Sequence, residues 1–107
     1  MISFDRSGTH DVITEQKSGR CCSDFFALAL CEALNQEGLQ YQPSPHGYFT
    51  DSDRFINVIP ECTNISVGYY DEHTVDEHLD YFHLQKLAQA CVFIEWELLP
   101  TLRCLND

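Results

Sequence analysis

One short run of residues constrains the fold of this chain more than any other. Residues 63–69, Thr-Asn-Ile-Ser-Val-Gly-Tyr, combine β-branched and apolar side chains, with no strand-breaking residue before Gly68. The run predicts a strand, and it continues into an acidic turn that carries one histidine, His73. A strand that delivers a histidine beside carboxylates is a natural place for a metal ligand. The run therefore predicts both a strand and a functional strand end.

The rest of the chain alternates between strand-like and helix-like patterns. Residues 2–4 and 11–14 predict two short strands, and the turn at residues 7–9 suggests that they form a hairpin. A cap at Ser23 or Asp24 predicts a helix that runs to about residue 36, and Gly38 ends it. We also expect a polar loop at residues 16–20, a short strand at 39–42 and a helical turn from about residue 52 to Ile59.

The second main helix is predicted over residues 81–96, and Pro100 ends or kinks the chain beyond it. One face of this helix is expected to carry Leu84, Leu87, Ala88 and Cys91. Taken together, the elements predict an α/β fold with a short mixed sheet and two main helices.

Composition limits the classes of function. The 107 residues predict a single domain over 1–107, and a hydrophobic share of 44% favours a globular protein. The formal charge is −11 with six Lys and Arg, so nucleic acid is not an expected partner. Neither a membrane span nor a signal peptide is expected, which predicts a cytoplasmic protein. The six cysteines form no C-x-x-C pair, so reduced thiols are expected rather than a structural zinc site.

Two residues stand at predicted strand ends. Asp5 ends the first strand, and taken alone it would be a surface carboxylate paired with Arg6. His73 ends the later strand, and taken alone it would be a solvated histidine. If the two strands are parallel, their ends lie at one edge of the sheet, where ligands of α/β proteins gather. Asp5 and His73 are therefore a candidate pair of metal ligands.

Several segments, read together, resemble the C-terminal half of the zinc-dependent aminopeptidase family, which comprises two-metal exopeptidases. The resemblance spans about residues 2 to 100, and its most specific part is Cys-Thr-Asn-Ile-Ser-Val-Gly-Tyr followed by His-Thr. The segments that carry it are residues 3–6, 11–14, 20–24, 49–51, 61–70 and 72–74.

The resemblance implies a partial phosphorylase/hydrolase-like zinc exopeptidase fold, with zinc as cofactor and a peptide-like substrate. Two zinc ions about 3.5–4 Å apart activate a water in such enzymes. By position, Asp5 resembles a ligand of one metal and His73 the last ligand of the other. The substrate pocket would then include Asp51, Tyr69 and Tyr70.

The family's first histidine, bridging aspartate and paired glutamates have no counterpart in this chain. A catalytic zinc normally takes three protein ligands. The chain is therefore expected to be inactive alone and to need an N-terminal polypeptide that completes the two-metal site.

Two other interpretations remain open. The acidic charge also suits a non-catalytic binding or inhibitor protein, such as a phage-encoded anti-defence protein, that kept the fold and lost the chemistry. A half-domain would also expose a sheet edge and an apolar face, which predicts a homo-oligomer.

Overall fold

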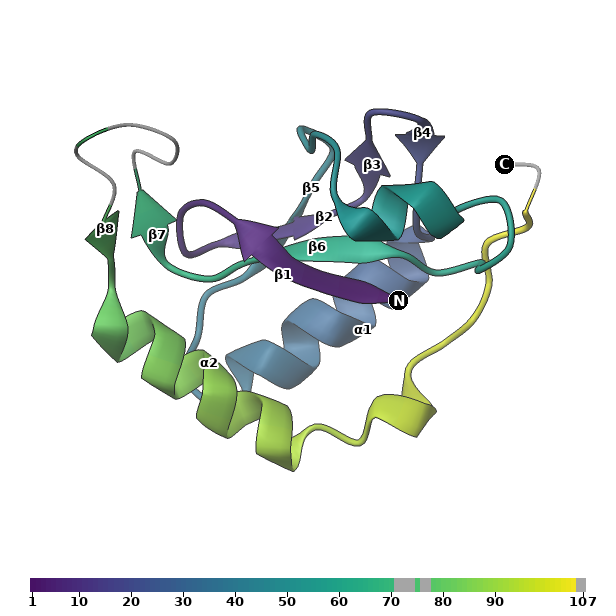
Figure 1. Cartoon of the computed structure of the whole chain (residues 1–107). Helices are drawn as coiled ribbons and strands as arrows, with labels where there is room; N and C mark the ends of the chain where they lie inside the picture. Colours follow the sequence, from purple (N-terminus) through teal and green to yellow (C-terminus); the bar gives the residue numbers. More distant parts are fainter. Residues whose placement is uncertain (71–74, 76–77, 106–107) are drawn as a thin grey trace.

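The strand predicted over residues 63–69 forms the centre of the sheet. In the computed structural model, which describes residues 1–70, 75 and 78–105, β6 (Thr63–Ser66) is buried along its whole length. It lies between β1 (Ile2–Arg6), which runs parallel to it, and β2 (Asp11–Ile13), which runs antiparallel. A fourth strand, β5 (Gln42–Ser44), pairs in parallel with β2 and gives the order β1-β6-β2-β5 (Figure 1). The sheet is therefore mixed, as predicted.

Two α-helices lie on one side of this sheet (Figure 1). The first, α1 (Asp24–Asn35), begins at Ser23, whose side chain accepts a hydrogen bond from the backbone N–H of Phe26. The second, α2 (Tyr81–Phe93), begins in the same way at Asp80. The remaining elements are β3 (Glu15–Gln16), β4 (Gly19–Arg20), β7 (Tyr69–Tyr70), β8 (His78–Leu79) and the 3-10 helices η1 (Asp51–Phe55) and η2 (Trp96–Leu98).

Apolar side chains are buried on both sides of the sheet. The larger cluster joins Val12 and Ile65 to the inner faces of the two helices. A smaller cluster on the other side contains Ile13, Cys21, Ile56 and Cys62. The alternation of Val12 and Ile13 between the clusters follows from the period of two along a strand. The radius of gyration of 13.3 Å matches the value of about 13 Å expected for a compact domain of this length.

The predicted hairpin of residues 2–4 and 11–14 is wrong. Both strands exist, but they pair with opposite edges of β6. Ser3 of β1 pairs with Asn64, and Val12 of β2 pairs with Ile65. The strand β6, although distant in sequence, lies between them because a buried strand needs hydrogen-bond partners for its backbone groups along both edges.

Other boundaries differ from the predictions by a few residues. The 63–69 strand breaks after Ser66, because Gly68 has a φ of +92° and redirects the chain into β7. The predicted loop at 16–20 contains the short pair β3 and β4, and the predicted 39–42 strand is β5 at 42–44. The second helix ends at Phe93 rather than at residue 96, and Ala88 is exposed rather than part of its buried face.

The six cysteines are free thiols, and four of them are buried, as expected for reduced core residues. No helix among the described residues is long and apolar enough to cross a membrane.

Glu61, two residues before β6, connects both terminal segments of the chain with α1. Its side chain is buried, and Oε1 accepts from the N–H of Ser23 at 2.7 Å. The other oxygen, Oε2, accepts from the Ser23 hydroxyl at 2.7 Å and from the N–H groups of Leu102 and Arg103 at 2.7 and 3.2 Å. The N-terminal ammonium of Met1 donates to the Glu61 carbonyl at 2.8 Å. The carboxylate of Glu61 therefore fixes the chain before β6 against α1 and the C-terminal tail, and its carbonyl fixes the start of β1.

We predict that Glu61→Gln destabilises the protein by about 2 to 4 kcal/mol, because the new amide N–H group would face a donor in a buried site. Urea denaturation of the wild type and the variant measures the difference. Glu32→Gln, on the exposed side of α1, is the matched control and should change stability by no more than about 0.5 kcal/mol. Equal effects of the two substitutions would contradict the role of Glu61.

Candidate functional site

The candidate site begins with a bulge in β1. Ile2 and Ser3 pair with Thr63 and Asn64, but Arg6 pairs with Ser66. Three steps along β1 therefore match two steps along β6, which places one extra residue between Ser3 and Arg6. Phe4 and Asp5 are consecutive exposed residues in this interval, where a regular strand would turn one of them inward. The bulge thus directs the Asp5 side chain outward.

The bulge is closed by a side chain rather than by the regular ladder. The Asp5 N–H donates to Oδ1 of Asn64 at 2.9 Å. Beyond the bulge the backbone pairing resumes, with Val67 N–H donating to the Arg6 carbonyl at 2.9 Å and Gly68 N–H donating to the Gly8 carbonyl at 2.7 Å. The position of Asp5 is therefore set by contacts on both sides of it.

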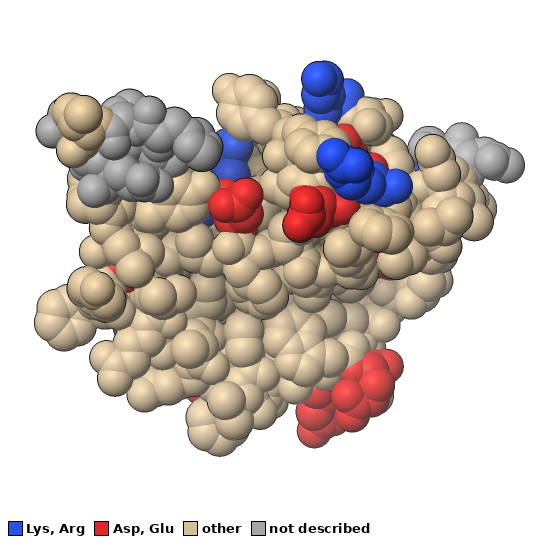
Figure 2. Space-filling view, viewed as in Figure 1, with Lys and Arg blue, Asp and Glu red and all other residues tan. Residues whose placement is uncertain are grey.

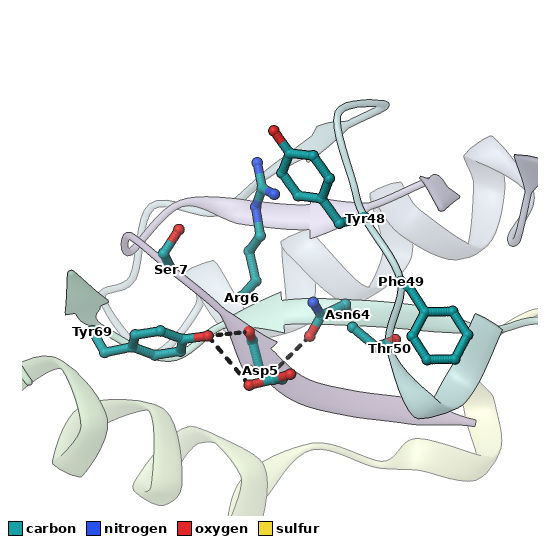
Figure 3. Close-up of a pocket in the computed structure, with 8 residues that line it drawn as sticks. All are labelled: Asp5, Arg6, Ser7, Tyr48, Phe49, Thr50, Asn64 and Tyr69. Carbon is teal, nitrogen blue, oxygen red and sulfur yellow. Dashed lines mark hydrogen bonds between the residues drawn. The ribbon is translucent and has the colours of Figure 1, made fainter. Parts of the chain in front are cut away.

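Asp5 borders a cavity of about 320 Å³ at this end of the sheet (Figure 3). Its walls come from the end of β1, from β6 and β7, and from the loop that precedes η1. The lining residues are Asp5, Arg6, Ser7, Tyr48, Phe49, Thr50, Asn64 and Tyr69. One carboxylate, one guanidinium and three aromatic rings therefore share a single small cavity.

The structure brings together some of the predicted site residues. The Tyr69 hydroxyl donates to the Asp5 carbonyl at 2.7 Å and lies 3.2 Å from Asp5 Oδ1. Asp51 lies in an adjacent cavity that also borders Asp5. Tyr70 is not among the lining residues of either cavity, and its ring stacks on His78 at a centroid distance of 5.3 Å. His73 lies outside the described residues.

The strand geometry agrees with the expectation for parallel strand ends. β1 and β6 run parallel and side by side, so Asp5 and the exit of β6 lie at the same end of the sheet (Figure 1). Tyr69, which follows β6, contacts Asp5 directly. The ends of β1 and β6 are therefore neighbours in the fold, while the position expected for His73 falls outside the described residues.

Asp5 is not paired with Arg6, contrary to the interpretation of Asp5 as an isolated surface residue. Arg6 Nε instead lies 3.2 Å from Oδ2 of Asp11, at the start of β2. The guanidinium carbon lies 5.7 Å from the centroid of the Tyr48 ring. Arg6 is therefore held by Asp11 and Tyr48, although Asp5 and Arg6 border the same cavity.

A buried polar network holds the loop that forms the far wall of the cavity. The Thr50 hydroxyl donates to Oε1 of Gln16 at 2.5 Å, and Gln16 Nε2 donates to the Ser52 hydroxyl at 2.9 Å. Ser52 in turn donates to the Thr63 carbonyl of β6, and its N–H donates to the Ser3 hydroxyl. Each member has a partner, so the loop is fixed relative to β1 and β6.

The described residues supply part of the ligand set that a zinc ion would need. Asp5 offers an exposed carboxylate, a common zinc ligand. Within 1–70, 75 and 78–105, however, no group of three or more His, Cys, Asp or Glu residues is arranged to hold a metal ion. Because a catalytic zinc needs three protein ligands, these residues do not form a complete metal centre.

Charges of both signs lie near this end of the molecule. Figure 2 shows Lys and Arg side chains beside Asp and Glu side chains on the half of the surface above β1, although the whole chain carries −11. The neighbourhood of the cavity is therefore not a uniformly acidic surface.

The sequence did not identify Asn64, Arg6 or Tyr48 as site residues. Asn64 could have been identified as a site residue because it is a polar residue within a strongly predicted buried strand. Buried polar groups need a partner or a ligand. Arg6 and Tyr48 gave no comparable signal, because their proximity depends on the pairing of β1 with β6.

Comparison of the chain with protein-family models, with curated proteins and with solved structures found no match.

The end of β6 is supported from the helix side by Tyr41 and His83. The Tyr41 hydroxyl donates to the Ser66 carbonyl at 2.5 Å and lies 2.7 Å from His83 Nε2. Because that hydroxyl proton is used by Ser66, His83 donates from Nε2 to the Tyr41 oxygen. Partial burial lowers the pKa of His83, with the carboxylate of Asp80 acting in the opposite direction.

We predict that the partial burial of His83 makes stability depend on pH. A lowered pKa means that folding favours the neutral imidazole, so the contribution is complete above the unfolded value near 6.5 and is lost as pH falls below it. The free energy of unfolding should decrease from pH 7 to pH 5, and it should decrease less in His83→Gln. His46 is an exposed loop residue, and His46→Gln is therefore the control. Identical pH profiles for wild type and His83→Gln would contradict the prediction.

Proposed function

We propose that this chain is one half of a zinc-dependent peptidase or amidohydrolase, inactive alone and completed by an N-terminal polypeptide. The observation that carries the proposal is the exposed Asp5 carboxylate, which a bulge in β1 directs into a cavity at the carboxyl end of two parallel strands. This is the end of an α/β sheet at which ligands bind. The proposal extends the family resemblance to this site and includes the zinc exopeptidase fold.

Asp5 would be the ligand of one metal ion, and His73, on the strength of the sequence alone, a ligand of the other. Tyr69, which contacts Asp5, and Asp51, in the adjacent cavity, would border a peptide-like substrate. Tyr70 is retained from the resemblance as a third pocket residue. The partner polypeptide would supply the remaining ligands and the general base.

The unpaired side of β1 supports a partner at this position. Among the described strands β1 has a neighbour on one side, and its exposed residues include Phe4 with an exposed fraction of 47%. Proteins protect such an edge with Pro, with charged side chains or with a bulge, and the opposite edge strand, β5, contains Pro43. In β1 the bulge and the charged residues Asp5 and Arg6 lie at its end, whereas Ile2 to Phe4 carry no such protection. An added strand would cover both its backbone groups and Phe4.

We predict that the chain alone does not hydrolyse leucine p-nitroanilide. Mixed with an N-terminal half that carries the missing histidine, bridging aspartate and paired glutamates, it should bind two zinc ions and hydrolyse this substrate. Asp5→Asn should reduce the rate by at least about a hundredfold, because the loss of a ligand leaves that metal weakly held. Zinc content by mass spectrometry and initial rates provide the two readouts.

Asp24→Asn is the matched control, since Asp24 is an exposed carboxylate that pairs with Arg20 and does not border either cavity. It should leave zinc content and rate unchanged. A mixture that neither takes up zinc nor hydrolyses the substrate would overturn the proposal.

The alternative is a non-catalytic acidic binding or inhibitor protein, and the double variant Asp5→Ala with His73→Ala distinguishes it from the peptidase half. If a cellular effect of the chain depends on metal chemistry, the double variant should abolish that effect. Retention of the full effect would favour the binding protein, and a concentration-dependent dimer of the chain alone would favour the homo-oligomer.

A further inference from the structure

The cavity beside Asp5 has a second polar wall that the zinc proposal does not use. Asn64 is 4% exposed, and its orientation is set because Oδ1 accepts from the Asp5 N–H. Its Nδ2 group has no hydrogen-bond partner among the described residues and is turned towards the Arg6 and Tyr48 side of the cavity (Figure 3). A buried amide that presents a free N–H₂ group to a cavity is suited to an acceptor on a ligand.

Arg6 supplies further donors to the same wall. Its Nε is paired with Asp11, but its two terminal nitrogens have no hydrogen-bond partner in the described part of the chain. The Arg6 side chain is 17% exposed, and the Tyr48 ring and the Asp11 carboxylate hold it at the edge of the cavity. A guanidinium with free terminal N–H groups is the usual protein partner of a carboxylate.

The charges determine what kind of carboxylate is accepted. Asp5 lines the cavity, and Asp11 stands behind Arg6, so the charges of these three residues sum to one negative charge. A simple anion would gain from Arg6 and lose to the two carboxylates. A ligand that also carries a positive group for Asp5 satisfies both ends.

Size and shape limit the ligand further. The cavity volume of about 320 Å³ suits a single amino acid or a short peptide. Tyr48 lines it and is exposed, so an apolar side chain of the ligand would cover its ring.

We propose that this cavity binds a small zwitterion of the α-amino acid type. The ligand carboxylate is bound by the Arg6 guanidinium and Asn64 Nδ2, the ammonium group contacts Asp5, and the side chain packs on Tyr48. The binding needs neither zinc nor a partner polypeptide, so it goes beyond the proposed peptidase half and is tested separately from it.

The test measures the affinity of three compounds for the chain alone in the presence of EDTA, by calorimetry and by NMR chemical shifts. L-phenylalanine carries both charges, N-acetyl-L-phenylalanine the carboxylate alone and L-phenylalaninamide the ammonium alone. The free amino acid should bind at least about tenfold more tightly than either derivative, since each derivative leaves one charged contact unmade.

Two variants locate the carboxylate subsite. Asn64→Asp keeps an oxygen for the Asp5 N–H and removes the amide donor, and Arg6→Gln removes the guanidinium without changing the buried strand. Each should weaken the binding of L-phenylalanine by about tenfold and leave that of L-phenylalaninamide unchanged or tighter. Circular dichroism verifies that each variant is folded.

Arg54→Gln is the matched control, because Arg54 also lies over an aromatic ring, that of Phe49, but does not line this cavity. It should bind all three ligands as the wild type does. The inference is overturned if L-phenylalanine does not bind, if L-phenylalaninamide binds as tightly, or if a folded Arg6→Gln retains full affinity. If the chain binds the amino acid but the reconstituted complex shows no peptidase activity, only the proposed function is overturned.

Discussion

The parallel pairing of β1 with β6, with one extra residue in β1, is the constraint on which the rest of the site depends. A regular strand would direct either Phe4 or Asp5 towards the core. The bulge leaves both exposed, and the Asn64 side chain replaces the missing backbone acceptor for Asp5. A single irregularity therefore turns a carboxylate outward beside the cavity and engages the Asn64 oxygen, so that the Asn64 N–H₂ group stays available to a ligand.

The other end of the same strand pair is held by Glu61. Its buried carboxylate accepts from the start of α1 and from the C-terminal tail, and its carbonyl accepts from the N-terminal ammonium. Arg103, also buried, donates to the carbonyls of Ile56 and Pro60 and fixes the loop that precedes β6. The register of β1 against β6 is thus determined at its start, and a displacement there would move Asp5. Stability and site geometry are coupled through this strand pair.

The sequence predicted the elements better than it predicted their pairing. Local signals located α1, whose cap at Ser23 was expected, and the central strand, which is rich in β-branched residues. The hairpin was wrong because the pairing of Val12 with Ile65 joins residues that are far apart in sequence, and no local pattern encodes it. Asp5 and Tyr69 were identified and do meet, whereas Asn64 acquires its role from the bulge, which is a property of two strands together. The ligand set of the metal site remains a prediction.

In the proposed function the site is incomplete by itself, and it lies beside β1, an edge strand of the described sheet. The central claim is that Asp5 holds a metal ion when a partner strand covers β1. The most direct test is the crystal structure of the reconstituted complex with zinc, located by its anomalous scattering. We predict a zinc ion about 2.0–2.2 Å from a carboxylate oxygen of Asp5, with the partner chain lying along β1. Zinc bound elsewhere, with Asp5 facing solvent, would contradict the account.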